Sequence, residues 1–168
     1  MAKLSSSFYR DANRVPVWTD GLITKKTITF AGATTNAWGD DAGTRDGGVL
    51  FTVTGLVYAS VIGICTTDTE GATSTEEVGI TGATAIFMPI TTMTNLEAGE
   101  IWFNNATPAT YTISGGATPA DRIPPEYILN GNDIIMTTKT ANTDSGVVDF
   151  YCIWRPISSD CDVVASTI

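Results

Sequence analysis

Three carboxylates lie close together in the segment GDDAGTRDGG (39–48), namely Asp40, Asp41 and Asp46. Clustered carboxylates among glycine-rich turns are ligands that calcium uses in proteins. The segment lacks the alternating Asp spacing and the distant Glu of an EF-hand, and its own Arg45 opposes a bound cation. Because Asp and Gly are also common turn formers, the sequence favours a solvated turn without a metal.

The adjacent carboxylates Glu76 and Glu77 are a second candidate for acid–base chemistry. That chemistry needs both groups to reach the same reacting atoms, whereas neighbouring residues of a β-strand point to opposite faces. We therefore interpret this pair as surface charge.

The chain has no histidine, so it offers few side chains for nucleophilic catalysis or for metal binding. Histidine is the commonest general base and metal ligand, so Ser/His/Asp and Cys/His arrangements cannot be built from this chain alone. The three cysteines, Cys65, Cys152 and Cys161, have no CxxC spacing that would indicate zinc. Their odd number and wide spacing favour reduced thiols. We expect no enzymatic activity, no metal and no cofactor.

Four tryptophans remain as candidates for binding: Trp18, Trp38, Trp102 and Trp154. Aromatic faces stack on pyranose rings, so these residues could line a sugar-binding groove. Tryptophan is more often an anchor of a core or an interface, and we favour that interpretation.

The elements that must position these residues are predicted to be β-strands. Thr, Val and Ile are frequent, charged residues make up only 16% of the 168, and short apolar stretches alternate with Gly-, Asn- and Asp-rich turns. We expect strands at 22–30, at 49–65 with a break at Gly55, at 78–80, and at 84–90 with Pro89 on a sheet edge. A hairpin is predicted from 133–140 and 146–157, and residues 126–131 are predicted as a single helical turn. In the second strand of this hairpin, alternation puts Phe150, Cys152 and Trp154 on one face and Asp149, Tyr151, Ile153 and Arg155 on the other, so both faces are expected to be largely covered.

This pattern predicts an all-β fold, a single antiparallel β-sandwich or jelly-roll-like barrel. The chain length suits one core, so we assign residues 22–168 to one domain and residues 1–21 to an extended N-terminal arm. No run of about 18 apolar residues occurs, and residues 1–20 lack the apolar centre of a signal peptide, so we expect synthesis in the cytoplasm and no membrane contact.

Charge divides the chain unevenly. Residues 1–26 hold five basic and two acidic side chains, a net charge of +3. The net charge of the whole chain is −9, so the remaining residues carry −12. Such an acidic body repels nucleic acid and anionic lipid, and direct binding to either is not expected.

The basic segment SSSFYRDANRVPVWTDG (5–21) has the composition of an interface. It combines arginines, which make bidentate contacts, with aromatic residues, which bury large areas. Its candidate contact residues are Phe8, Tyr9, Arg10, Arg14 and Trp18. The alternative is that the segment covers the core of its own domain.

Several stretches together resemble one group of viral proteins. They are MAKLSSSFYRDANRVPVWTDGLITKKTITFAGATTNAWGD at the front, VIGICTTDT and GEIWFNNATP in the middle, and FYCIWRPISSD near the end. In this pattern the chain resembles small tailed-bacteriophage virion structural proteins of the head decoration, or capsid cement, type.

The resemblance implies a non-enzymatic protein on the outer surface of the virion, made in the host cytoplasm. Its partners would be the major capsid protein, whose lattice it would stabilise, and further copies of itself in a homotrimer, with no small-molecule substrate. The alternative is a tail or head-fibre adhesin-like module that binds host glycan or protein through the loops around Trp38 and Trp102. A hydrolase acting through carboxylates is the least favoured of the three.

Overall fold

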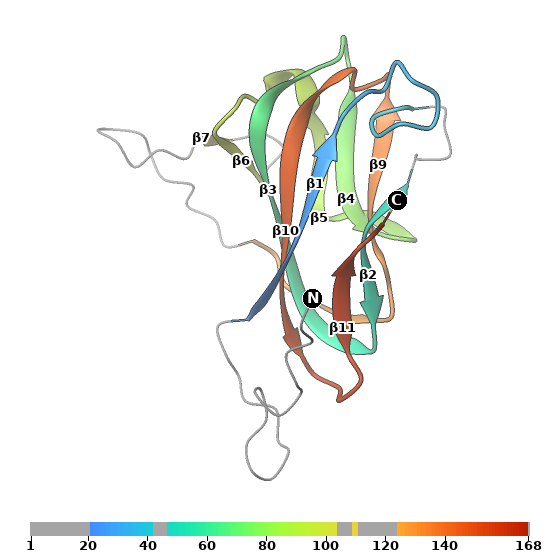
Figure 1. The fold of residues 1–168 in the computed structure, drawn as a ribbon, viewed down its shortest axis with the longest axis vertical. Coiled ribbons are helices and arrows are strands. Elements are labelled where there is room, and N and C mark those ends of the chain that lie inside the picture. Colours follow the sequence, from blue (N-terminus) through green and yellow to red (C-terminus); the bar gives the residue numbers. More distant parts are fainter. Residues whose placement is uncertain (1–20, 42–46, 104–108, 111–123, 168) are drawn as a thin grey trace, which may run out of the picture.

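The computed structural model describes residues 21–41, 47–103, 109–110 and 124–167. Strands make up 63% of these residues, and they form two antiparallel sheets packed face to face (Figure 1). The predicted all-β sandwich is confirmed. The predicted arm lies almost wholly outside the described residues, so the division of the chain at residue 21 stays a prediction.

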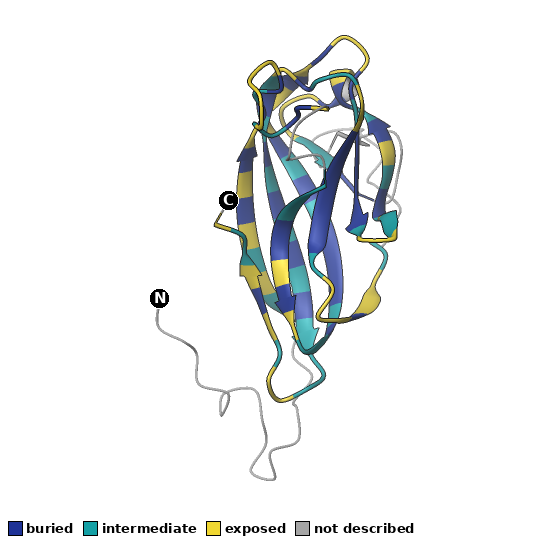
Figure 2. Ribbon diagram, turned by 90° about the vertical axis from the view of Figure 1, so that its right-hand side faces the viewer, coloured by how far each residue is buried: buried dark blue, intermediate teal, exposed yellow. Residues whose placement is uncertain are grey.

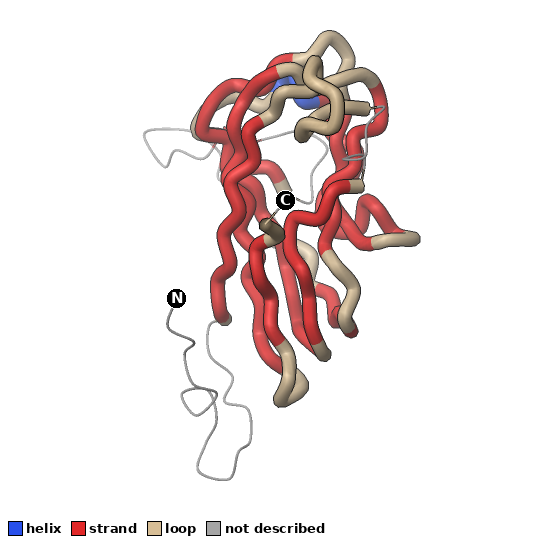
Figure 3. The backbone as a smooth tube through the Cα atoms, turned by 45° about the vertical axis from the view of Figure 1, so that its right-hand side comes forward, coloured by secondary structure: helices blue, strands red, loops and turns tan. Residues whose placement is uncertain are grey.

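The first sheet has the order β1 (Leu22–Thr29), β10 (Ser145–Pro156), β3 (Leu56–Glu70), β6 (Glu100–Trp102) and β7 (Ala109–Thr110). The short strand β8 (Tyr127–Asn130) pairs with the first part of β3, on the side away from β10. The second sheet has the order β11 (Asp162–Ala165), β2 (Gly48–Thr54), β9 (Ile134–Thr140), β4 (Thr75–Ile80) and β5 (Ala83–Thr92). A single helical turn, η1 (Met93–Asn95), lies at one end of the sandwich, among the loops (Figure 3).

The strands pair in a nested order. The innermost pair is the hairpin β4–β5, and around it β3 pairs with β8, β2 with β9, and β1 with β10, all antiparallel. The chain thus resembles one long hairpin wound into two sheets, because successive pairs alternate between the first and the second sheet.

Most sequence-based strand assignments agree with the structure. Gly55 has a positive φ of 65° and separates β2 from β3, and Pro89 lies in β5, the outermost strand of its sheet. The helical turn predicted for 126–131 is wrong, because residues 127–130 form strand β8. The non-local pairing of β8 with β3 buries Leu129 and overrides the local preference.

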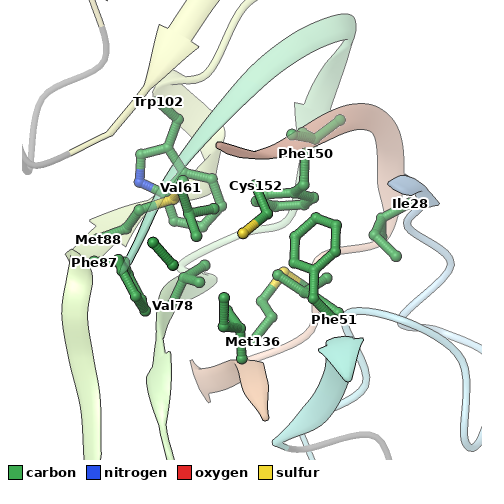
Figure 4. Packing of buried hydrophobic residues seen from close by; sticks show 14 of the residues in the cluster. Ile28, Phe51, Val61, Val78, Phe87, Met88, Trp102, Met136, Phe150 and Cys152 are labelled. Atoms are coloured by element: carbon green, nitrogen blue, oxygen red, sulfur yellow. The ribbon is translucent and has the colours of Figure 1, made fainter. Parts of the chain in front are cut away.

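The core lies between the two sheets. Along β10 the expected alternation is present, with Phe150, Cys152 and Trp154 buried. Bands of buried and less buried residues run along the strands in Figure 2. Figure 4 shows the central packing, in which Trp102 and Phe150 contact edge to face with ring centroids 5.7 Å apart. One cluster of buried side chains draws on both sheets, so the described strands share a single core.

Side-chain hydrogen bonds close the sandwich where the outermost strands β1 and β11 meet. The Thr24 hydroxyl donates to the carbonyl oxygen of Val163 at 2.8 Å, and the Lys26 ammonium donates to that of Ser166 at 2.6 Å. On the other side, the Trp102 indole N–H in β6 donates to the Thr91 hydroxyl in β5 at 3.0 Å. These contacts tie the first sheet to the second along both sides.

Candidate functional site

The residues proposed from the sequence as a capsid interface, Phe8, Tyr9, Arg10, Arg14 and Trp18, lie outside the described residues. Their role stays a prediction. The remaining candidates are described by the structure, apart from Asp46. Of the other two loop carboxylates, Asp40 is buried and Asp41 is exposed.

The carboxylates Glu76 and Glu77 are buried, so their interpretation as surface charge is wrong. They do point to opposite faces of β4, but both faces are covered there. Glu76 is fully buried and accepts hydrogen bonds from the hydroxyls of Thr138, at 3.0 Å, and Thr143, at 2.9 Å. The carboxylate of Glu77 pairs with the ammonium of Lys139 at 3.0 Å. Each group therefore has a structural partner.

The loop that follows β1 uses its polar groups to hold its own shape. The Asp40 carboxylate accepts a 2.7 Å hydrogen bond from the backbone N–H of Asn36, which has a positive φ of 64°. The Gly32 N–H donates to the Thr143 carbonyl oxygen, and the Thr143 N–H donates to the Gly39 carbonyl oxygen, both at 2.9 Å. This loop is thereby fastened to the loop between β9 and β10.

The described carboxylates of this loop do not form a calcium-binding cluster. Within the described ranges, no three Cys, Asp or Glu side chains gather closely enough to hold a metal ion. Asp46, the third carboxylate of the sequence pattern, lies outside those ranges.

The three cysteines are free thiols, and two of them are buried. Burial raises the pKa of Cys65 to about 11 and that of Cys152 to about 12. Because the thiolate is the reactive form, neither sulfur is a nucleophile near neutral pH.

The tryptophans of the β-sandwich are mostly core residues. Trp102 is fully buried, Trp154 is 7% exposed, and Trp38 is partly buried beneath the Lys26 ammonium, 5.5 Å from the centre of its ring. Trp102 therefore offers no ring face to a glycan, which removes one of the two anchors of the glycan-binding alternative.

The outer side of the first sheet is largely apolar, which the sequence indicated only for Tyr151 and Ile153. Eight apolar or aromatic side chains point away from the core there, and we call them the outer apolar face: Ile23, Tyr58, Ile62, Ile64, Ile101, Ile128, Tyr151 and Ile153. Ile23 is 66% exposed and Ile128 is 61% exposed. A usable signal was present, since Leu56–Ile64 reads as a nearly continuous apolar run instead of alternating.

Two ion pairs lie on the same side of the sheet. The Lys25 ammonium is 2.7 Å from the Asp149 carboxylate, which also accepts a 2.6 Å hydrogen bond from the Thr27 hydroxyl. Burial raises the pKa of Asp149, and the hydrogen bonds from Lys25 and Thr27 lower it. The lowering is the larger effect, so the pKa of Asp149 lies below its ordinary value. The Arg155 guanidinium binds the Glu126 carboxylate at 3.0 Å.

Within the described residues, no helix is long and apolar enough to cross a membrane. Comparisons with protein-family models, curated proteins and solved structures gave no match to this chain.

Proposed function

We propose that this protein is a non-enzymatic decoration protein of a tailed-bacteriophage capsid, which binds the outer surface of the major capsid protein lattice and stabilises the head. The observation that carries the proposal is that the candidate reactive groups in the described residues serve the fold. Glu76, Glu77 and Asp40 have partners within the β-body, and the thiols of Cys65 and Cys152 are buried.

The strand order supports a viral structural role. Nested antiparallel pairs wound into two sheets are the arrangement expected of a jelly roll, a fold used in viral capsid and lectin domains. A fold alone does not select a function. The sequence resemblance and the charge division favour the capsid, because an acidic body needs a basic segment to dock on an acidic shell.

In this proposal residues 1–21 contact the shell through Arg10, Arg14 and the neighbouring aromatic residues, and copies assemble as a homotrimer on the lattice. Every described strand begins after residue 21, so the segment can bind while the sandwich stays intact.

The test is a capsid-binding assay with a chain that lacks residues 1–18. We expect this chain to keep its β-sheet circular dichroism and to lose stable attachment to expanded capsids. Substituting both Arg10 and Arg14 by Ala should weaken attachment by about 2 to 5 kcal/mol per subunit if both arginines sit in buried charge pairs. Lys3→Ala is the matched control, because it removes a charge from the same segment without touching those residues.

Two results would overturn the proposal. One is a truncated chain that decorates capsids as well as the full chain does. The other is a gel of purified particles that shows only a few copies per virion, since a fibre needs few copies and decoration needs many. A truncated chain that fails to fold would instead show that the segment covers the core.

A further inference from the structure

We propose that the outer apolar face of the first sheet packs against a second copy of this chain. The proposed function already includes assembly of copies; the inference adds the surface through which two copies meet, and it does not depend on what those copies bind.

The face departs from the usual pattern of an antiparallel sheet. Such a sheet commonly packs one side on the core and turns polar residues to water on the other. Here both sides of the central strands are rich in apolar residues, and the most exposed of the outer ones, Ile23 and Ile128, lie on β1 and β8. Contiguous exposed apolar surface of this kind marks interaction sites.

Strand register makes the face continuous. Ile23 lies opposite Ile153, and in the next outward row Lys25 lies opposite Tyr151, which lies opposite Ile62. Tyr58 lies opposite both Arg155 and Ile128, and Ile64 lies opposite both Asp149 and Ile101. The apolar residues therefore form one surface over five strands, β1, β10, β3, β8 and β6, which is four strands wide because β8 and β6 both lie beside β3.

The size of the surface sets the expected strength of association. Four strands spaced ~4.8 Å apart and six residues that each rise ~3.3 Å give a planar area on the order of 400 Å². A standard interface buries about 800 Å² on each partner. We therefore expect self-association at micromolar or higher concentration instead of a permanent dimer.

The ion pairs on the outer apolar face argue against a partner that is recognised by its charge. The two cations of this side, Lys25 and Arg155, are engaged with Asp149 and Glu126, so these four groups sum to zero. The same cations lie over aromatic rings of the face, with Lys25 5.6 Å from the ring centre of Tyr151 and Arg155 5.0 Å from that of Tyr58. A partner selected by its charge, such as nucleic acid or anionic lipid, would need cations that are not already engaged.

The rest of the body repels a second copy. The described residues hold four basic side chains, Lys25, Lys26, Lys139 and Arg155, against fourteen acidic ones, a net charge of −10. Two such bodies repel each other wherever their acidic surfaces meet. They approach at lowest cost through the outer apolar face, where Lys25 and Arg155 are each paired with a carboxylate, whereas the exposed Asp68 and Glu70 lie farther along β3.

The experiment is sedimentation equilibrium of the full chain from about 1 µM to 1 mM. We expect the mean mass to rise from that of the 17.7 kDa monomer towards a defined oligomer. Ile23→Lys combined with Ile128→Lys places two like charges on the face of each copy, and should raise the dissociation constant at least tenfold. Circular dichroism and thermal melts check that the variant is folded.

The matched control is Ile90→Lys on β5 of the other sheet, where the side chain is 49% exposed. This variant should associate as the unchanged chain does. Added salt should preserve or strengthen association, because it screens repulsion between acidic bodies and leaves apolar contact in place.

Five outcomes would overturn the inference: a monomer throughout the concentration range, equal association of the double variant, equal loss in the Ile90→Lys control, a closed trimer, or open-ended growth. A dimer that the double variant dissolves supports the inference, because two identical faces in contact are related by a twofold axis, whereas a trimer needs the face to pack against a different surface. Capsid binding is not measured here, so failure of this inference leaves the proposed function to its own test.

Discussion

The hydroxyl of Thr143 donates a 2.9 Å hydrogen bond to the carboxylate of Glu76, and both side chains are fully buried. The contact joins strand β4 to the loop between β9 and β10, where the loop that follows β1 is also fastened. A buried carboxylate that loses a donor bears the cost of desolvation without compensation.

Thr143→Val should therefore lower the free energy of unfolding by about 1 to 3 kcal/mol, measured by urea denaturation. The matched control is Thr66→Val, which removes an exposed hydroxyl that donates to the Val147 carbonyl oxygen at 3.2 Å, and this change should cost less than about 0.5 kcal/mol. Equal effects of the two substitutions would contradict a special role for the buried bond.

Gly39→Ala should destabilise the protein more than Gly82→Ala does. Both glycines have a positive φ, 89° and 87°, so both substitutions carry a similar backbone strain of about 1 kcal/mol. Only at Gly39 would the new Cβ overlap the Thr143 carbonyl oxygen, whereas nothing lies within 4 Å of a Cβ at Gly82. Thermal melts of the two variants would measure the difference, and equal melting temperatures would refute the close approach of the two loops.

Acid should weaken the contact between β1 and β10. The folded-state pKa of Asp149 lies below its ordinary value, so its contribution to stability is present above about pH 4 and is lost as the pH falls through that lower pKa. Asp149→Asn should make the loss of stability between pH 6 and pH 2 smaller, by about 1 kcal/mol or less for a pair near the surface. Urea denaturation at several pH values would measure it, with the exposed Glu97→Gln as the control.

The cysteines should differ in reactivity. At pH 8 the native protein should react with iodoacetamide first at Cys161, which is partly exposed, because burial holds the pKa of Cys65 and of Cys152 well above this pH. In urea all three thiols should react. Mass spectrometry would count the adducts, and equally fast labelling of Cys152 in the native protein would contradict its burial.

The local sequence pattern predicted the positions of the strands well, but it predicted poorly which side chains the strands bury and contact. Alternation along residues 149–155 put Phe150, Cys152 and Trp154 on one face, which the structure buries, and Pro89 indicated a sheet edge, because both signals act within one strand. Alternation also placed Glu76 and Glu77 on opposite faces. It does not reveal that the hydroxyls of Thr138 and Thr143 meet Glu76, because those contacts depend on pairing with residues more than sixty positions away.

The outer apolar face illustrates the same limit. The apolar residues of β1, β3 and β10 were visible separately, but their union into one surface depends on the register that sets Ile23 beside Ile153 and Tyr151 beside Ile62. The candidate interface at residues 8–18 rests on composition alone, so it stays a prediction.

The nested strand order has a consequence for synthesis on the ribosome. The hairpin β4–β5 can form as soon as residue 92 has emerged, but β1, which ends at Thr29, has no partner until β10 begins at Ser145. At roughly 10 residues per second, β1 waits on the order of ten seconds as an unpaired strand that carries the exposed Ile23. Because the outermost pair closes the longest loop, it should form late, and folding should take milliseconds to seconds. Nascent chains stalled before residue 145 should therefore be far more prone to aggregate and to recruit chaperones than chains stalled after residue 156.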